Sequence, residues 1–84
     1  MKNSLYIISQ NYETVIHEWQ SIFIKDNTVI ATFANNQACI LGVYQTKQGA
    51  DAAFAGIIVR LAEGLYNVYS MPPYNYNGEN NPNQ

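Results

Sequence analysis

The chain contains one cysteine, Cys39, and one histidine, His17, the two residue types best suited to nucleophilic catalysis. A cysteine nucleophile needs a base within hydrogen-bonding distance, and histidine is the usual base. Cys39 lies in the middle of a β-prone run, where a cysteine is commonly a small buried apolar residue. His17 is flanked by Glu13 and Glu18, an arrangement common on ordinary protein surfaces. We therefore expect no catalytic residues and no enzymatic activity.

The carboxylates and the sequence motifs lead to the same expectation. The six Asp and Glu residues show no pair at a spacing that suggests acid–base catalysis. One cysteine and one histidine cannot form a zinc site of the usual kind. The chain also lacks a phosphate-binding loop, a nucleophile elbow and a dinucleotide-binding fingerprint. We expect neither a metal ion nor a cofactor.

The tyrosines near the C-terminal end offer a candidate binding site. Four of the seven tyrosines lie between positions 66 and 76, interleaved with asparagines. Tyrosine supplies contact area at a low entropic cost, and an arginine can bind a phosphate or a carboxylate. These residues predict a site for a small nucleotide-type ligand, formed by Arg60, Tyr66, Tyr69 and Tyr74.

A structural explanation of the same residues stays open. The strand that contains Tyr66 and Tyr69 can pack on the sheet with no ligand. Arg60 can form a salt bridge with Glu63 or Asp51, the commoner fate of a surface arginine.

The pattern of elements predicts a single α+β domain over residues 1–71. Short β-prone runs lie at residues 5–8, 12–17, 21–25, 28–34 and 37–44, separated by turn-prone residues. They indicate an antiparallel meander of four to five strands. Thr46 can cap a helix over residues 47–63, which would pack on one face of the sheet and be followed by an extended segment over residues 65–71. Residues 72–84 are rich in Asn and Pro, and we expect them to be disordered.

The turns set the register of the meander and sort its side chains into two faces. Asp26-Asn27 and Asn35-Asn36 both suit two-residue hairpin turns. This register places Ile22, Val29 and Ala31 under the helix, together with Ala38 and Ile40. The opposite face, which should be mostly polar, then carries four apolar residues: Phe23, Ile30, Leu41 and Val43. Either the extended segments at the two ends of the chain cover this face, or a second protomer does.

The helix presents a second apolar surface. The residues Ala50, Ala53, Phe54, Ile57, Ile58 and Leu61 follow the spacing of one buried helical face. The opposite face carries the small or apolar residues Ala52, Ala55, Gly56 and Val59, where exposed helices usually carry Lys and Glu. Alanine is also the best helix former, which would explain these residues without a partner. Because two separate faces are apolar, we expect a homo-oligomer.

The charge of the chain excludes two classes of partner. Only 12% of the residues are charged, and the net charge is −2. Such a surface has no basic field to attract nucleic acid or an anionic membrane. No apolar run is long enough for a signal peptide or a membrane span, so we expect a protein of the cytoplasm.

Four short segments, Leu5–Gln10, Ser21–Asp26, Cys39–Thr46 and Tyr69–Pro72, resemble small uncharacterised proteins from prophages and mobile elements of low-GC Gram-positive bacteria. The resemblance implies a meander-plus-helix fold and a mobile-element origin, and for a phage-encoded protein the host cytoplasm. Such an origin suggests counter-defence. We therefore expect a non-catalytic, homo-oligomeric binding protein that sequesters a small nucleotide-type ligand or blocks a host protein. The alternative is an assembly accessory protein that only associates with itself.

Overall fold

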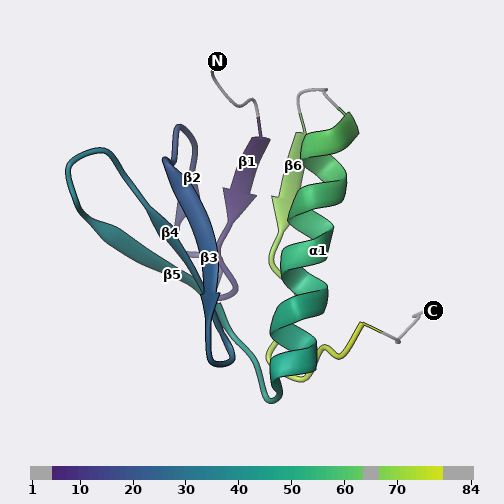
Figure 1. The fold of residues 1–84 in the computed structure, drawn as a ribbon. Helices are drawn as coiled ribbons and strands as arrows, with labels where there is room; N and C mark the ends of the chain where they lie inside the picture. The colour runs from purple at the N-terminus through teal and green to yellow at the C-terminus, as the bar shows by residue number, and fades with distance from the viewer. Residues whose placement is uncertain (1–4, 64–66, 79–84) are drawn as a thin grey trace.

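The described residues, 5–63 and 67–78 of this computed structural model, form six strands and one helix (Figure 1). This arrangement confirms the α+β class, a meander, which has three strands rather than four or five, and the helix that follows it. In chain order the elements are β1 (Leu5–Ile8), β2 (Val15–Ile16), β3 (Ser21–Lys25), β4 (Thr28–Thr32), β5 (Ala38–Val43), α1 (Lys47–Glu63) and β6 (Asn67–Ser70).

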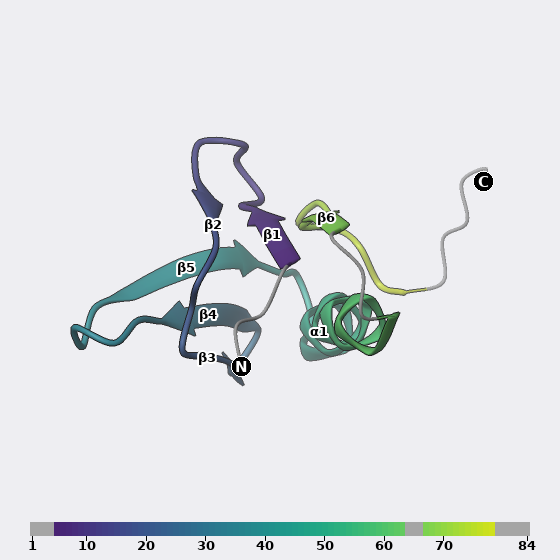
Figure 2. The same ribbon diagram turned by 90° about the horizontal axis from the view of Figure 1, so that it is seen from above.

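The strands form two three-stranded sheets. The meander gives the sheet β3–β4–β5, in which both pairs are antiparallel. The other sheet has the order β2–β1–β6, and its pairing of β1 with β6 is parallel. The helix contacts β3 and β4 on one side and β6 on another, as the view from above shows (Figure 2). Both sheets therefore share one core with the helix.

Strand β1 and the segment after β6 contribute side chains to the core. Strand β1 contributes Leu5 and Ile7, and Met71 follows β6. These side chains join the same buried cluster as residues of the helix and of the inner face of the meander. The end strands thus cover the face that the helix also covers, and they leave the outer face of β3–β4–β5 open. The buried cluster consists of Leu5, Ile7, Ile16, Val29, Ala31, Leu41, Tyr44, Ala50, Ala53, Ile57 and Met71.

The register of the first hairpin is as predicted. Ile24 pairs with Val29 and Phe23 with Ile30 around the two-residue turn. Asp26 has a positive φ of 58°, a conformation that aspartate tolerates better than most residues.

The predicted register of the second hairpin is wrong by one residue. The turn is longer than two residues, because the Phe33 N–H donates to the Gln37 carbonyl and Asn36 takes a positive φ of 68°. This geometry is typical of a three-residue hairpin loop. Ala31 therefore pairs with Cys39, and a β-bulge lies further along between the two strands. As a result Leu41 is buried, whereas Ile40, expected inside, is 60% exposed on the outer face.

The buried stripe of the helix is narrower than predicted and consists mostly of small residues. Ala53 and Ile57 are buried as expected, but Ile58 is half exposed and Leu61 lies at the surface. Gly49 is buried as well, so the stripe is shifted toward the side that faces β6 and the segment after it. No helix in residues 5–63 or 67–78 has both the length and the apolar character that crossing a membrane requires.

Residues 71–78, which we call the C-terminal strap, lie against the start of the helix rather than as the disordered tail that we expected from residue 72. The Tyr44 hydroxyl donates to the Pro72 carbonyl at 2.9 Å, and the Gln45 N–H donates to the Tyr74 carbonyl at 2.9 Å. The carbonyl of Tyr76 lies directly over Gly49. Residues 79–84 of the expected tail lie outside the described residues.

Candidate functional site

Arg60 and Tyr69, two members of the predicted ligand site, lie together between α1 and β6. The Arg60 guanidinium is 5.7 Å from the centre of the Tyr69 ring, and its Nη1 donates to the Val68 carbonyl at 3.2 Å. The Tyr69 hydroxyl donates to the Ala53 carbonyl at 3.1 Å. Burial raises the pKa of Tyr69 to about 12. Both side chains therefore make polar contacts within the fold, as expected of structural residues.

Tyr74 does not join them. Tyr74 is exposed in the strap beside Gln45, which precedes the helix, whereas Arg60 is in the last turn. A helix rises about 1.5 Å per residue, so these two residues lie at opposite ends of α1. Tyr66 lies outside the described residues. Arg60 also does not pair with Asp51, which instead forms a 3.0 Å ion pair with Lys47.

Substitution of Arg60 by alanine is expected to lower the free energy of unfolding by about 1 kcal/mol, because a cation–π contact and a hydrogen bond are lost together. Urea denaturation measures the effect. Lys47→Ala is the control, since its exposed ion pair with Asp51 should contribute no more than about 0.5 kcal/mol. Equal effects of the two substitutions would contradict a structural role of Arg60.

The small residues on the back of the helix have different environments. Gly56 faces the Tyr69 hydroxyl so closely that a β-carbon would collide with it. Ala52 lies next to Gly78 of the strap. Ala55 is exposed, and Val59 is 56% exposed. Two of the four candidate interface residues on the helix are thus contacted within the chain, and two face solvent.

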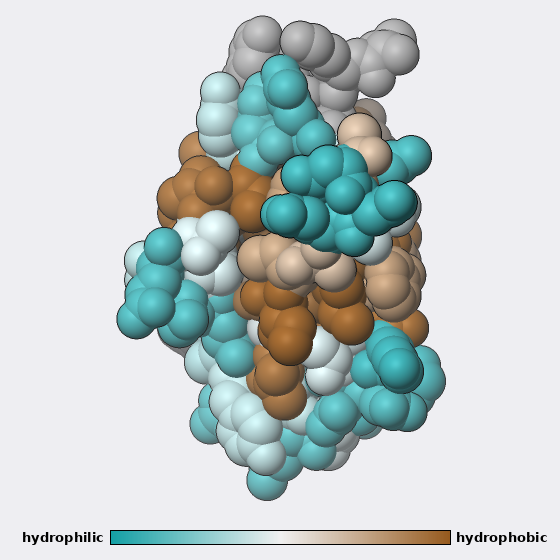
Figure 3. All heavy atoms as spheres, turned by 90° about the vertical axis from the view of Figure 1, so that its left-hand side faces the viewer, coloured by the Kyte–Doolittle hydropathy of each residue, from teal (hydrophilic) through white to brown (hydrophobic). Residues whose placement is uncertain are grey.

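The outer face of β3–β4–β5 carries an apolar patch. We define the outer patch as Phe23, Ile30, Ile40 and Val43, in which Ile40 stands where we had expected Leu41. Ile40 is 60% exposed, Phe23 41% and Val43 38%. Figure 3 looks onto this side of the molecule and shows apolar side chains gathered near its centre with hydrophilic ones around them. Three of its four residues, Phe23, Ile30 and Val43, belong to the predicted apolar face.

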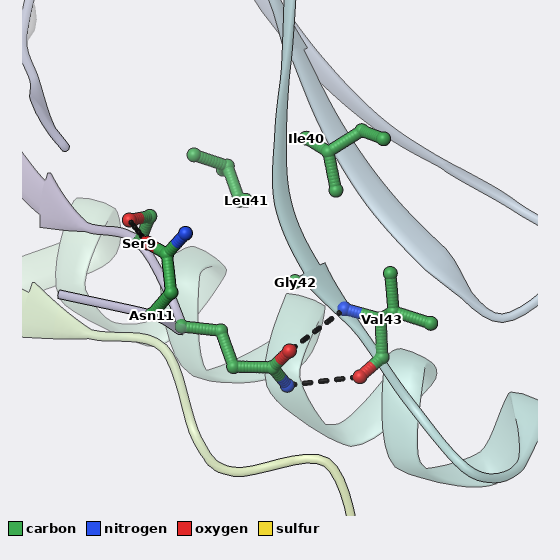
Figure 4. A pocket seen from close by; sticks show the side chains of 7 residues that line it. Ser9, Asn11, Ile40, Leu41, Gly42 and Val43 are labelled. Atoms are coloured by element: carbon green, nitrogen blue, oxygen red, sulfur yellow. Dashed lines mark hydrogen bonds between the residues drawn. The ribbon is translucent and has the colours of Figure 1, made fainter. Parts of the chain in front are cut away.

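A small pocket adjoins the outer patch. Ile40, Leu41, Gly42 and Val43 line one side, and the turn residues Ser9, Gln10 and Asn11 line the other (Figure 4). Its volume is about 170 Å³. Pockets for small-molecule ligands usually measure about 300–1,000 Å³, so this one suits a single side chain of a partner rather than a nucleotide.

Gln10 fixes the wall of this pocket. Its side-chain Nε2 donates to the Val43 carbonyl at 2.9 Å, and its Oε1 accepts from the Val43 N–H at 3.2 Å. The amide thus pairs with β5 as the backbone of a neighbouring strand would. The same Nε2 also donates to the Pro72 carbonyl at 3.1 Å. Gln10 was not among the predicted site residues, because one glutamine in a turn-prone run carries no signal of such a contact.

Comparison with known proteins adds no relative. No family model matches the chain, and no curated protein or solved structure matches it either.

Cys39 and His17 have surroundings typical of structural residues. Cys39 is half-buried and packs against the core from the inner face of β5. The His17 ring stacks on Tyr6, with 4.2 Å between ring centres and 8° between planes. Within residues 5–63 and 67–78, no three His, Cys, Asp or Glu residues gather where they could hold a metal ion.

Proposed function

We propose that this protein is a non-catalytic binding protein that forms a homo-oligomer through its outer patch and blocks a host protein. The observation that carries the proposal is the exposure of Phe23, Ile40 and Val43 on one sheet face. The solvated face of an antiparallel sheet is normally polar, and contiguous exposed apolar side chains usually mark an interface. The mobile-element resemblance suggests counter-defence as the biological setting.

Contact with a protein is favoured over capture of a nucleotide for two reasons. The pocket beside the outer patch has a volume that suits one side chain. Arg60, the candidate phosphate ligand, already contacts the Val68 carbonyl and the Tyr69 ring. A nucleotide would have to break these contacts before it could bind.

A second copy of the chain is the first partner to test. The outer patch has no charged member, its near neighbours Ser21 and Thr32 share a hydrogen bond of 2.6 Å between their hydroxyls, and Lys25 at the end of β3 is the one charged residue on this face of the three strands. Two copies that meet through such a surface bring few like charges together. The exposed Val59 on the helix offers a second contact surface, and two surfaces permit a closed ring as well as a dimer.

Ile40→Lys is expected to dissociate the oligomer, because a lysine charge would have to lose its water at the centre of the interface. Light scattering coupled to size-exclusion chromatography gives the native mass of both proteins. Val15→Lys is the matched control, since Val15 is also 60% exposed but lies on β2 outside the outer patch. A monomeric wild type, or an Ile40→Lys variant that keeps the wild-type mass, would contradict the proposal.

The wild-type protein and the Arg60→Ala variant distinguish the remaining two functions, ligand sequestration and self-assembly. A nucleotide mixture should leave the melting temperature of the wild type unchanged. A rise in melting temperature that Arg60→Ala abolishes would instead indicate ligand sequestration. A stable oligomer that binds neither nucleotide nor any host protein would indicate the assembly accessory protein.

A further inference from the structure

Asn77 differs from every other asparagine of the chain in the residue that follows it. The sequence contains eleven asparagines, and Asn77 is the one followed by glycine. In the structure Asn77 and Gly78 are both exposed near the end of the C-terminal strap, outside any helix or strand. Gly78 has a φ of +84°, in the region that glycine adopts without strain.

We propose that Asn77 is a site of spontaneous deamidation. The backbone nitrogen of Gly78 attacks the side-chain carbonyl carbon of Asn77, and the bond from that carbon to Nδ2 breaks. The nitrogen of Gly78 loses its proton, and the side-chain NH₂ group takes up a proton and leaves as ammonia, so that a five-membered succinimide ring remains. Water then opens the ring at either carbonyl and gives aspartate or isoaspartate at position 77. No enzyme and no co-reactant other than water is needed.

Glycine is what makes this position reactive. The attack requires the nitrogen of the next residue to approach the side chain, and a β-carbon on that residue obstructs the approach. The next residue is larger at the other described turn asparagines, which are followed by Tyr12 (Asn11), Thr28 (Asn27), Asn36 (Asn35), Gln37 (Asn36) and Tyr76 (Asn75). We therefore expect Asn77 to react before the others.

The products differ in their effect on the strap. The Asn77 carbonyl accepts a hydrogen bond of 3.5 Å from Gln48, which lies in the first turn of α1, where no acidic residue is present. A carboxylate near the N-terminus of a helix is favourable, so the aspartate product should keep the strap in place. Isoaspartate inserts one more carbon into the backbone and shifts this carbonyl, so that product should loosen the strap.

Mass spectrometry of the full chain after incubation at pH 8 and 37 °C tests the proposal. Trypsin releases residues 61–84, because Arg60 precedes them. This peptide should gain about 1 Da as NH₂ is replaced by OH, and fragmentation should place the gain at position 77. The peptide 26–47, which contains Asn27, Asn35 and Asn36, serves as the internal control.

Gly78→Ala should slow the gain at least about tenfold, because of its β-carbon. Asn77→Gln should abolish the early gain, and it provides a second variant if Gly78→Ala disturbs the packing on Ala52. A first gain at another asparagine, an unchanged mass, or equal rates in the wild type and Gly78→Ala would overturn the proposal.

Discussion

Substitution of Gly49 by alanine is expected to lower the free energy of unfolding by about 2 kcal/mol or more, although alanine in a helix is normally favoured over glycine by about 1 kcal/mol. Gly49 is buried in the first turn of α1, and a β-carbon there would collide with the backbone carbonyl of Tyr76. A backbone atom cannot rotate away as a side chain can. The strap or the helix must therefore move, and urea denaturation measures the loss.

Two further substitutions control for helix propensity. At Gly56 a new β-carbon meets the Tyr69 hydroxyl, the end of a side chain that can rotate, so Gly56→Ala should cost less than Gly49→Ala. Ala55→Gly, on the exposed side of the same helix, should cost about 1 kcal/mol from propensity alone. A Gly49→Ala protein that is more stable than the wild type would contradict the packing of the strap on α1.

The free energy of unfolding is expected to fall as the pH rises from about 10 to 12, because two tyrosines are buried in the folded protein. Burial raises the pKa of Tyr69 to about 12, and burial followed by repulsion from an ionised Tyr69 raises the pKa of Tyr44 further. In the unfolded chain both phenols ionise near their ordinary pKa of about 10. The folded state therefore holds more protons above pH 10, so the free energy of unfolding is unaffected below this pH and falls as the pH rises toward 12.

The slope of this loss is testable by single substitutions. For the fully buried Tyr44 the expected slope is about 1.4 kcal/mol per pH unit. Tyr44→Phe should make the fall in the free energy of unfolding between pH 10 and 12 less steep, as measured by urea denaturation. At neutral pH it should cost about 1 kcal/mol, because the hydrogen bond to the Pro72 carbonyl is lost. Tyr12→Phe, at a tyrosine that is 75% exposed, should keep the wild-type slope. A wild-type slope in Tyr44→Phe would contradict this origin of the alkaline sensitivity.

Local features of the sequence were sufficient where neighbouring residues determine the structure. The Asp26-Asn27 turn gave the β3–β4 register, and the change from period two to helical spacing after Thr46 gave the helix over residues 47–63. The apolar outer face was also predictable, because alternation along β3 and β4 does not depend on distant residues. The identity of its β5 members was not, since Asn35-Asn36 suits a two-residue or a three-residue loop equally well.

Contacts between distant segments left no such signal. The parallel pairing of β1 with β6 joins residues about 60 positions apart, and neither strand indicates its partner by composition. The contact of Tyr76 with Gly49 is of the same kind, because glycine inside a helix has several explanations. The lack of a sequence signal for such contacts affected the predicted ligand site most. Tyr69 and Tyr74 are close in the sequence, which suggested that they also lie together in the fold. The strap instead runs along the helix and separates them.

The parallel pairing of β1 with β6 also determines when the protein can finish folding during synthesis. Strand β1 emerges from the ribosome first, and the β3–β4–β5 hairpins can form while translation continues. Strand β1 can pair early with β2, but its parallel partner β6 and the Pro72 carbonyl, which accepts from the Gln10 side chain, are made last. Until then Leu5 and Ile7 lack the cover that the finished fold provides. A nascent chain that stalls before residue 72 therefore presents an apolar N-terminal strand to chaperones and proteases.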